Sequence, residues 1–112
     1  MSSLAQQHCV PCQGGVPPLA ETAARDLLAR LEGGWSLAGG KLEKEYRFPS
    51  FQANIAFLNR VAAVAEVEGH HPEMQVGFRT LKLSIWTHKI SGLTESDFIL
   101  AAKADAVLIM PR

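Results

Sequence analysis

The sequence has no excess charge of either sign and no long apolar segment. Its 11 lysines and arginines balance 11 aspartates and glutamates, so no overall field would attract nucleic-acid phosphates or an anionic membrane. No apolar run approaches the roughly 18 residues needed to cross a bilayer, and the first residues lack a basic segment followed by an apolar one. We therefore expect a cytoplasmic protein that binds neither nucleic acid nor membrane.

Cysteine is also scarce, and both cysteines lie in the segment His8-Cys9-Val10-Pro11-Cys12. This spacing resembles a redox dithiol or half of a zinc site. However, no further cysteine exists to complete a structural zinc site, and the glycines and prolines after Cys12 indicate a loop instead of a thioredoxin-like helix. We interpret residues 1–18 as a flexible N-terminal arm, because chain ends fray. A metal site completed by His8 or by another subunit is the alternative.

The length and composition predict a single domain at residues 19–112. A chain of 112 residues can bury a hydrophobic core but has no room for a separate cofactor domain. Its content of 47% hydrophobic and 20% charged residues is typical of a globular protein. No internal repeat or low-complexity segment indicates any other organisation.

Apolar spacing and turn residues predict three helices and four strands, in the order α-β-β-α-β-β-α. Ser50 is the expected N-cap of the central helix, Gly69 its expected stop, and Thr94 the expected cap of the last helix. Two hairpins without a parallel crossover predict an α+β fold, a four-stranded antiparallel sheet with helices packed on one face. The predicted elements span residues 19–31, 35–38, 42–48, 51–68, 73–78, 79–88 and 95–108.

Three of the four histidines lie close together in the sequence. His70 and His71 follow the central helix, and His88 ends the last predicted strand. A free imidazole has a pKa of about 6.5, so it can hold or release a proton near neutrality, and carboxylates such as Glu66 and Asp97 can tune which it does. Three converging imidazoles could therefore serve as an acid, a base and a substrate anchor.

Three short segments carry a specific combination of residues: Glu66-Val67-Glu68-Gly69-His70-His71-Pro72, Trp86-Thr87-His88 and Gly92-Leu93-Thr94-Glu95-Ser96-Asp97. Together they resemble the pterin-4a-carbinolamine dehydratases, over a region from about Leu19 to the end of the chain. The resemblance implies dehydration of 4a-hydroxytetrahydrobiopterin, the product of aromatic amino-acid hydroxylases, to the quinonoid dihydropterin. It also implies that no metal or organic cofactor is used.

The resemblance assigns roles to individual side chains and implies a quaternary structure. The expected catalytic residues are His70, His71 and His88. The expected supporting carboxylates are Glu66 and Asp97, and the expected substrate contacts are Pro72, Trp86 and Thr87. The resemblance further implies a homodimer or homotetramer, formed by joined sheets and packed helices, and a functional link to the hydroxylase that supplies the pterin.

Three positions depart from the pattern of some members of this family. Those members carry an acidic residue where this chain has Gly69, a tryptophan where it has Met74, and a tyrosine where it has Phe78. These departures change groups around the expected pocket but leave its histidines in place.

The reaction explains why histidines are needed. Loss of the 4a-hydroxyl as water requires an acid at the departing oxygen, electron donation from the adjacent nitrogen, and a base for the ring-nitrogen proton. We expect His70 and His88 to transfer the protons and His71 to bind or orient the substrate. Asp97 would either orient a histidine or only cap the last helix, and Trp86 would pack as a pocket wall or stack on the pterin.

Two other classes of function stay open at this point. In the first, His70, His71 and His88 would hold a zinc ion together with a water molecule, although adjacent histidines on a rigid turn rarely both reach one metal. In the second, the protein would be a non-enzymatic module that binds a partner through its helices. Such a scaffold has no need to keep three histidines together.

Overall fold

Alternating apolar residues form a four-stranded antiparallel sheet in the computed structural model, which describes residues 3–10 and 17–108. Leu81, Leu83 and Ile85 are fully buried on one face of the last strand, whereas Lys82 and Ser84 lie between them on the other face. The predicted alternation is therefore confirmed. The strands are β1 (Ser36–Ala38), β2 (Lys41–Arg47), β3 (Glu73–Val76) and β4 (Thr80–Ile85), in the spatial order β1-β2-β4-β3.

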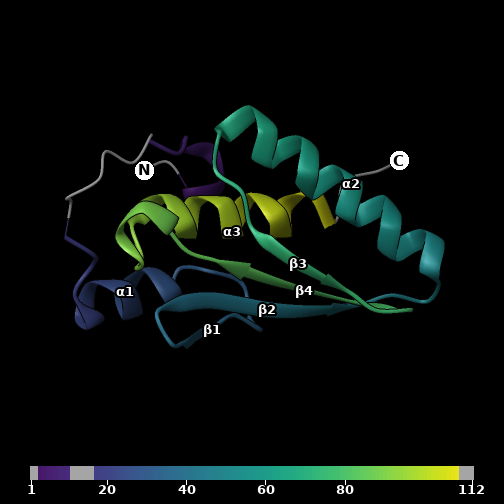
Figure 1. Cartoon of the computed structure of the whole chain (residues 1–112), viewed down its shortest axis with the longest axis horizontal. Coiled ribbons are helices and arrows are strands. Elements are labelled where there is room, and N and C mark those ends of the chain that lie inside the picture. The colour runs from purple at the N-terminus through teal and green to yellow at the C-terminus, as the bar shows by residue number, and fades with distance from the viewer. Residues whose placement is uncertain (1–2, 11–16, 109–112) are drawn as a thin grey trace.

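The helices complete the predicted α+β fold. They are α1 (Glu21–Leu28), α2 (Phe51–Glu68) and α3 (Glu95–Leu108). Helices α2 and α3 lie on the same side of the sheet (Figure 1), and their buried side chains, such as Phe57 and Phe98, form one core with the inner face of the sheet. Within residues 3–10 and 17–108, no helix is long and apolar enough to span a membrane.

Both ends of α2 have the predicted caps. The Ser50 hydroxyl accepts a hydrogen bond from the Ala53 N–H at 3.1 Å. At the other end, Gly69 adopts a left-handed conformation with φ of 65° and donates its N–H to the Ala65 carbonyl, a conformation that glycine adopts without strain. The chain therefore turns sharply at Gly69, and this turn sets the direction in which His70 leaves the helix.

The last predicted strand is too long at its C-terminal end. Strand β4 ends at Ile85, and His88 instead begins a short 3₁₀ helix, η2 (His88–Ile90). The cause is a tight loop: the Thr87 N–H donates to the Gly92 carbonyl at 2.8 Å, and Ser91 adopts a left-handed φ of 48°. The predictions of a helix over 19–31 and a strand over 73–78 are also too long by a few residues at their ends.

Residues 3–10 of the predicted arm lie against the domain. Leu4 begins a 3₁₀ helix, η1 (Leu4–Gln6), and is buried in the same core as α2 and α3. Cys9 is half-buried, whereas Cys12 and most of the loop predicted after it lie outside the described residues. The domain boundary at residue 19 and the flexibility of the arm stay predictions.

Candidate active site

The two histidine segments line a single cleft at one end of the sheet. Strands β3 and β4 pair antiparallel with Glu73 opposite Ser84, so the residues just before β3 and just after β4 are brought together. The cleft has a volume of about 360 Å³, within the range of small-molecule sites. It is lined by Gly69, His70, His71, Pro72, Trp86, Thr87, His88 and Lys89.

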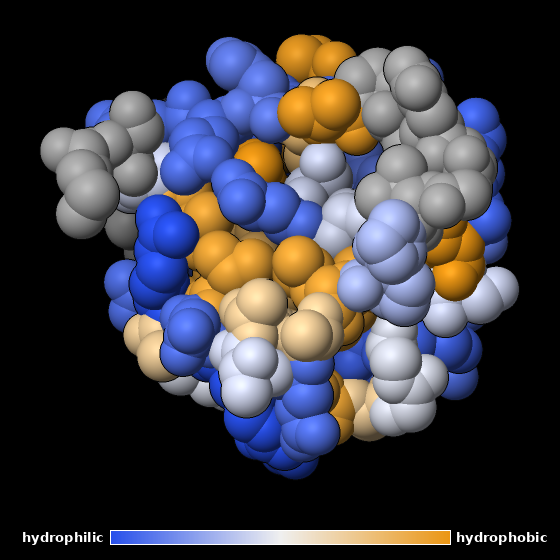
Figure 2. Space-filling view, turned by 90° about the vertical axis from the view of Figure 1, so that its left-hand side faces the viewer, coloured by the Kyte–Doolittle hydropathy of each residue, from blue (hydrophilic) through white to orange (hydrophobic). Residues whose placement is uncertain are grey.

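The cleft lies where α2 ends and α3 begins, the left-hand end of Figure 1. Figure 2 faces this end and shows hydrophobic surface exposed among hydrophilic residues. Small-molecule sites usually combine apolar walls with a few polar groups that fix orientation. In the cleft itself, Pro72 and Trp86 supply the apolar walls and the three histidines supply the polar groups, a combination suited to a flat, polar heterocycle.

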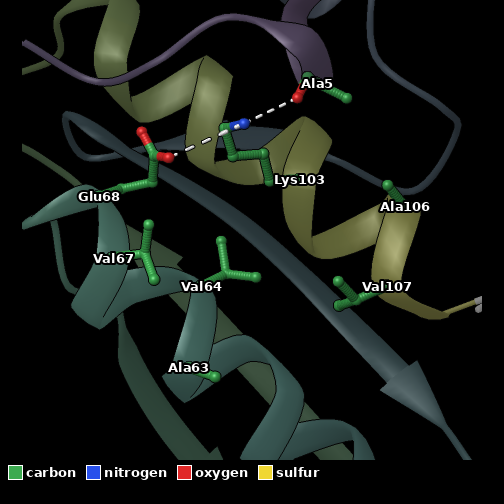
Figure 3. A pocket seen from close by; sticks show the side chains of 8 residues that line it. All are labelled: Ala5, Ala63, Val64, Val67, Glu68, Lys103, Ala106 and Val107. Atoms are coloured by element: carbon green, nitrogen blue, oxygen red, sulfur yellow. Dashed lines mark hydrogen bonds and ion pairs between the residues drawn. The ribbon is translucent and has the colours of Figure 1, made fainter.

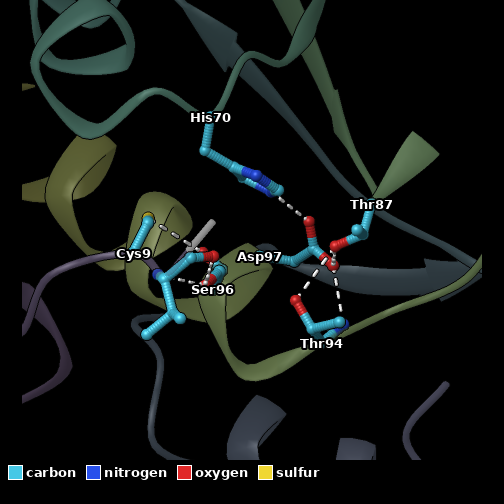
Figure 4. Close-up of polar contacts among 7 residues, drawn as sticks. Cys9, His70, Thr87, Thr94, Ser96 and Asp97 are labelled. Carbon is cyan, nitrogen blue, oxygen red and sulfur yellow. Dashed lines mark hydrogen bonds and ion pairs between the residues drawn. The ribbon is translucent and has the colours of Figure 1, made fainter. Parts of the chain in front are cut away.

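His70 is paired with a fully buried carboxylate. Its Nε2 lies 2.6 Å from Oδ1 of Asp97, whose side chain is 0% exposed, while the His70 side chain is 13% exposed (Figure 4). An ionised carboxylate only accepts hydrogen bonds, so Nε2 carries the hydrogen, and Nδ1 is the nitrogen left to exchange a proton with a ligand. The pair therefore fixes both the position and the tautomer of His70.

Asp97 is in turn held at the start of α3 and by Thr87, which follows β4. Its Oδ2 accepts a hydrogen bond from the Thr94 N–H at 2.8 Å and another from the Thr87 hydroxyl at 2.9 Å. The two threonine hydroxyls also lie 2.9 Å apart. Asp97 thus caps the helix and binds His70 with the same carboxylate. The carboxylate lies at the N-terminal end of α3, where the helix dipole favours negative charge.

His71 has a carboxylate partner as well, but a solvent-exposed one. Its Nε2 lies 2.7 Å from Oε1 of Glu66, and the two side chains are 59% and 78% exposed. Exposed pairs of this kind contribute little, about 0–1 kcal/mol. Glu66 can orient His71, but it holds the ring far less firmly than Asp97 holds His70.

His88 is positioned by an aromatic ring instead of a carboxylate. Its imidazole stacks on Trp86 with ring centroids 4.2 Å apart and an interplanar angle of 5°. The Lys41 ammonium lies 4.3 Å from the centroid of the Trp86 ring, a cation–π contact. Trp86 therefore packs as a wall of the cleft and supports His88.

The three imidazoles do not form a metal-binding set. Among residues 3–10 and 17–108, no group of three or more His, Cys, Asp or Glu side chains is placed to hold a metal ion. His70, His71 and His88 instead contact three different groups. The zinc alternative thus finds no ligand set in the described part of the chain.

Two contributors to the site were not predicted from the sequence. Lys89 lines the cleft beside His88. It could have been predicted from its place next to that histidine in the sequence. Thr94 was expected only as a helix cap, yet its N–H and hydroxyl reach Asp97 and Thr87. The Thr87 hydroxyl, expected to contact the substrate, is likewise bonded to Asp97.

Comparison with known proteins identifies the family. A family model described as pterin 4 alpha carbinolamine dehydratase matches residues 17–107. The chain belongs to this family. A protein of Rickettsia bellii named "Putative pterin-4-alpha-carbinolamine dehydratase" is 50% identical over 104 residues, covering 92% of each chain. Dehydratases of this name are hydro-lyases, so the predicted family and enzyme class are confirmed.

Two solved structures have a similar fold. A transcriptional coactivator/pterin dehydratase from Brucella melitensis has a TM-score of 0.77 and 27% identity, and covers 81% of this chain and 98% of its own. A pterin dehydratase-like protein described as a RuBisCO assembly factor in the alpha-carboxysome has a TM-score of 0.57 and 26% identity, with 69% and 89% coverage. Proteins of this dehydratase fold therefore include one described by an assembly role.

Proposed function

We propose that the protein dehydrates 4a-hydroxytetrahydrobiopterin, or a closely related 4a-hydroxytetrahydropterin, to the quinonoid dihydropterin and water. The observation that carries the proposal is the cleft in which three histidines meet and one of them is bonded to a buried aspartate. Membership of the dehydratase family supports the substrate class. The same cleft would suit any reaction that moves two protons on a small heterocycle, and membership of the family favours the pterin reaction among these.

The proposed reaction needs only proton transfer. The bond between C4a and the hydroxyl oxygen breaks, and that oxygen leaves as water after taking a proton. A double bond forms between C4a and N5, and the proton on N5 passes to a base. No electrons are exchanged with a second molecule, so a pair of imidazoles, one charged and one neutral, meets every requirement.

Within this proposal His70 is the base and His88 the acid. Because Asp97 holds the hydrogen on Nε2 of His70, its Nδ1 would take the N5 proton. Protonated His88, fixed against Trp86, would deliver a proton to the departing oxygen. Each transfer contributes roughly 10²–10⁴-fold to the rate.

The other cleft residues would bind and orient the pterin. His71, which Glu66 holds only loosely, would hydrogen-bond the substrate, and Pro72 and Trp86 would contact its ring. The Thr87 hydroxyl would act through Asp97, to which it is bonded. This division makes His71 important for KM and makes His70 and His88 important for kcat.

We further propose that the enzyme recycles the pterin of an aromatic amino-acid hydroxylase, in the cytoplasm, as a homodimer or homotetramer. Strand β3 is an edge of the sheet, and the exposed side chains of Val76 and Phe78 lie at its end. An open, apolar strand edge favours pairing with a second copy. Light scattering during size-exclusion chromatography would test this, and a Phe78→Glu variant that stays oligomeric would argue against this edge.

Turnover of freshly generated 4a-hydroxytetrahydropterin, followed by ultraviolet absorbance, tests the enzymatic proposal. We expect acceleration by the wild-type protein, a loss of about 10²–10⁴-fold in kcat for His70→Ala and His88→Ala, and mainly a raised KM for His71→Ala. Lys82→Ala, on the polar face of the sheet, is the matched control and should behave as wild type. No acceleration by wild-type protein would favour a scaffold. Loss of turnover in His71→Ala with normal turnover in His88→Ala would overturn the division of roles.

A further inference from the structure

The N-terminal arm contacts the end of α2, which precedes His70, and the start of α3, which carries Asp97. Residues 8–10, called here the arm segment, lie between the last residue of α2, Glu68, and the first turn of α3 at Ser96. Figure 4 shows Cys9 beside Ser96, which directly precedes Asp97. The proposed chemistry does not use these contacts, and Cys9 also packs against the core of the domain.

Glu68 is the arm segment's anchor on α2. Its Oε1 accepts the Cys9 N–H at 2.7 Å, and its Oε2 lies 3.0 Å from Nδ1 of His8 and 3.9 Å from Nζ of Lys103. The Glu68 side chain is only 5% exposed, so its charge depends on these partners. Only Gly69 separates this anchor from His70.

Ser96 is the corresponding anchor on α3. Its hydroxyl accepts the Val10 N–H at 2.9 Å and donates to the Val10 carbonyl at 3.4 Å, and its carbonyl accepts the Cys9 thiol at 3.4 Å. Ser96 is buried, and among the described residues its side chain bonds to Val10 of the arm alone. The next residue along the helix is Asp97.

A third link joins the same two helices farther from the cleft. Lys103 of α3 donates from Nζ to the carbonyl of Ala5 at 2.8 Å and lies within ion-pair distance of Glu68 (Figure 3). Leu4, beside Ala5, is buried in the core. The arm is therefore fixed at one end by an apolar side chain, and farther along the chain its backbone bonds to Glu68 and Ser96.

We infer that Glu68 and Ser96 are positioning residues, which use the arm segment to hold the end of α2 and the start of α3 at the spacing that the His70–Asp97 hydrogen bond requires. His70 and Asp97 stand one or two residues from these anchors, on elements that come from different parts of the chain. A hydrogen bond of 2.6 Å loses strength steeply when its partners move apart or tilt. The inference rests on the proposed function only where it concerns turnover.

The charges around the arm segment agree with a firmly held contact. The hydrogen bond from the Cys9 N–H, assisted by His8 and Lys103, holds the pKa of Glu68 below its usual value although burial opposes this. A carboxylate of lowered pKa stabilises the contact at neutral pH and loses this effect only as the pH falls through that lowered pKa. Burial, together with the negative charge of Glu68, raises the pKa of the Cys9 thiol to about 12, which keeps it a neutral and unreactive hydrogen-bond donor.

The test compares full-length variants that release the arm segment in graded steps. We expect Ser96→Ala and Glu68→Ala each to lower kcat, and the double variant to lower it about 10- to 100-fold, because small misplacements of catalytic groups are costly. KM should change by less than about threefold, since no pterin contact is removed. Glu68→Gln keeps an oxygen that can accept the Cys9 N–H and should restore most of the activity.

Two further measurements do not depend on turnover. In a Cys12→Ser background, alkylation of Cys9 should be slow with the wild-type anchors and at least about tenfold faster in the double variant, as the thiol gains solvent and its pKa falls. The ¹⁵N imidazole spectrum of His70 should change from one tautomer to a mixture. Asp105→Asn, at the other end of α3, controls for a general loss of stability and should leave kcat and the His70 spectrum unchanged.

The outcomes separate this inference from the proposed function. If the double variant makes Cys9 reactive but keeps wild-type kcat and an unchanged His70 spectrum, the arm is only a structural attachment and the inference is wrong. If the wild-type protein shows no dehydratase activity but the His70 spectrum changes on release of the arm, the positioning role holds and the proposed function fails. A spectral change in Asp105→Asn equal to that in the double variant would also overturn the inference.

Discussion

Helix α3 carries an aspartate with little exposed surface near each end: the Asp97 side chain is 0% exposed and that of Asp105 is 9% exposed. The two have different surroundings. Asp97 accepts hydrogen bonds from His70, Thr87 and the Thr94 N–H. Asp105 accepts hydrogen bonds from Trp35 Nε1 at 2.8 Å, Lys44 Nζ at 2.8 Å and the Tyr46 hydroxyl at 2.5 Å. Each carboxylate is thus satisfied by three donors, as buried charges must be.

The difference lies in the partners. A histidine can change charge near neutral pH, so the cluster around Asp97 can take part in proton transfer. The three donors to Asp105 named above differ in this respect. Burial and the hydrogen bond to Asp105 raise the pKa of Tyr46 far above its usual value, an indole does not titrate, and a lysine ordinarily stays charged near neutral pH. A cavity of about 600 Å³ borders Asp105, against about 360 Å³ at the histidine cleft. Low exposure and cavity volume therefore do not distinguish the aspartate of the proposed catalytic site from Asp105, whereas the chemistry of the partners does.

The largest expected effect that separates the two aspartates is that of Asp97→Asn on catalysis. The asparagine oxygen can still accept from Thr87 and Thr94, which places its amide nitrogen against Nε2 of His70 and forces that ring into the other tautomer. We expect kcat/KM to fall by about 10²–10⁴-fold, measured with the pterin dehydration assay. Circular dichroism should show a folded protein. Activity within a few-fold of wild type would mean that Asp97 is as structural as Asp105.

Asp105→Asn should have the opposite profile. It leaves the Lys44 ammonium, which is 13% exposed, beside a neutral amide. Removing one partner of a largely buried ion pair in this way costs up to about 3 kcal/mol. Urea unfolding should show this loss of stability, while kcat stays within about twofold of wild type well below the melting temperature. A large drop in kcat without a loss of stability would reverse the distinction between the two clusters.

Alkaline titration provides a direct view of the Asp105 cluster, because Tyr46 is the only tyrosine in the chain. Its pKa in the folded protein is raised above the ordinary value of 10.0, mainly by burial, so the unfolded state releases this proton first as the pH rises. Stability should fall by about 1.4 kcal/mol per pH unit above pH 10, and the phenolate absorbance should appear only on unfolding. Tyr46→Phe is the control and should lack this part of the slope. Phenolate formation in the folded protein near pH 10 would contradict a buried, bonded Tyr46.

The smallest effects come from removing one donor on each side of the comparison. Trp35→Phe deletes the indole N–H but leaves Asp105 two donors, so we expect a loss of about 1 kcal/mol in unfolding free energy and no change in kcat. Thr87→Val removes one donor to Asp97 at a similar cost in stability, but it should also lower kcat by about tenfold, because His70 depends on that carboxylate. Equal effects of the two variants on kcat would remove the distinction.

Most of the fold follows from patterns that are local in the sequence. Alternation in β4, the Ser50 cap and the Gly69 stop are decided by neighbouring residues, and all three are confirmed. The prediction that the last strand extends to His88 was wrong, because Trp86, Thr87 and His88 continue the alternation of apolar and polar residues. The chain leaves the strand there because Gly92 bonds back to Thr87, a closure that no alternation pattern contains.

The site could be predicted only in part, because its most informative contacts join distant residues. The histidines were predicted from a motif. For Asp97 the sequence left two roles open, orienting a histidine or only capping the last helix. The Asp105 cluster gave no signal, since Asp105 lies in an alanine-rich helix and its partners are 59 to 70 residues away. The hydrogen bond between Glu68 and Cys9 also joins residues 59 positions apart. It could not be predicted, because the composition of residues 1–18 indicates an unstructured chain end.

The chain holds two tryptophans, and the fold assigns one to each of the regions compared above. Trp35 is bonded to Asp105, whereas Trp86 stacks on His88. A protonated imidazole in van der Waals contact with an indole quenches its emission, so the fluorescence of Trp86 should dim when His88 gains a proton. With Trp35 replaced by phenylalanine, the protein would act as its own optical probe of charge in the cleft, without any added label.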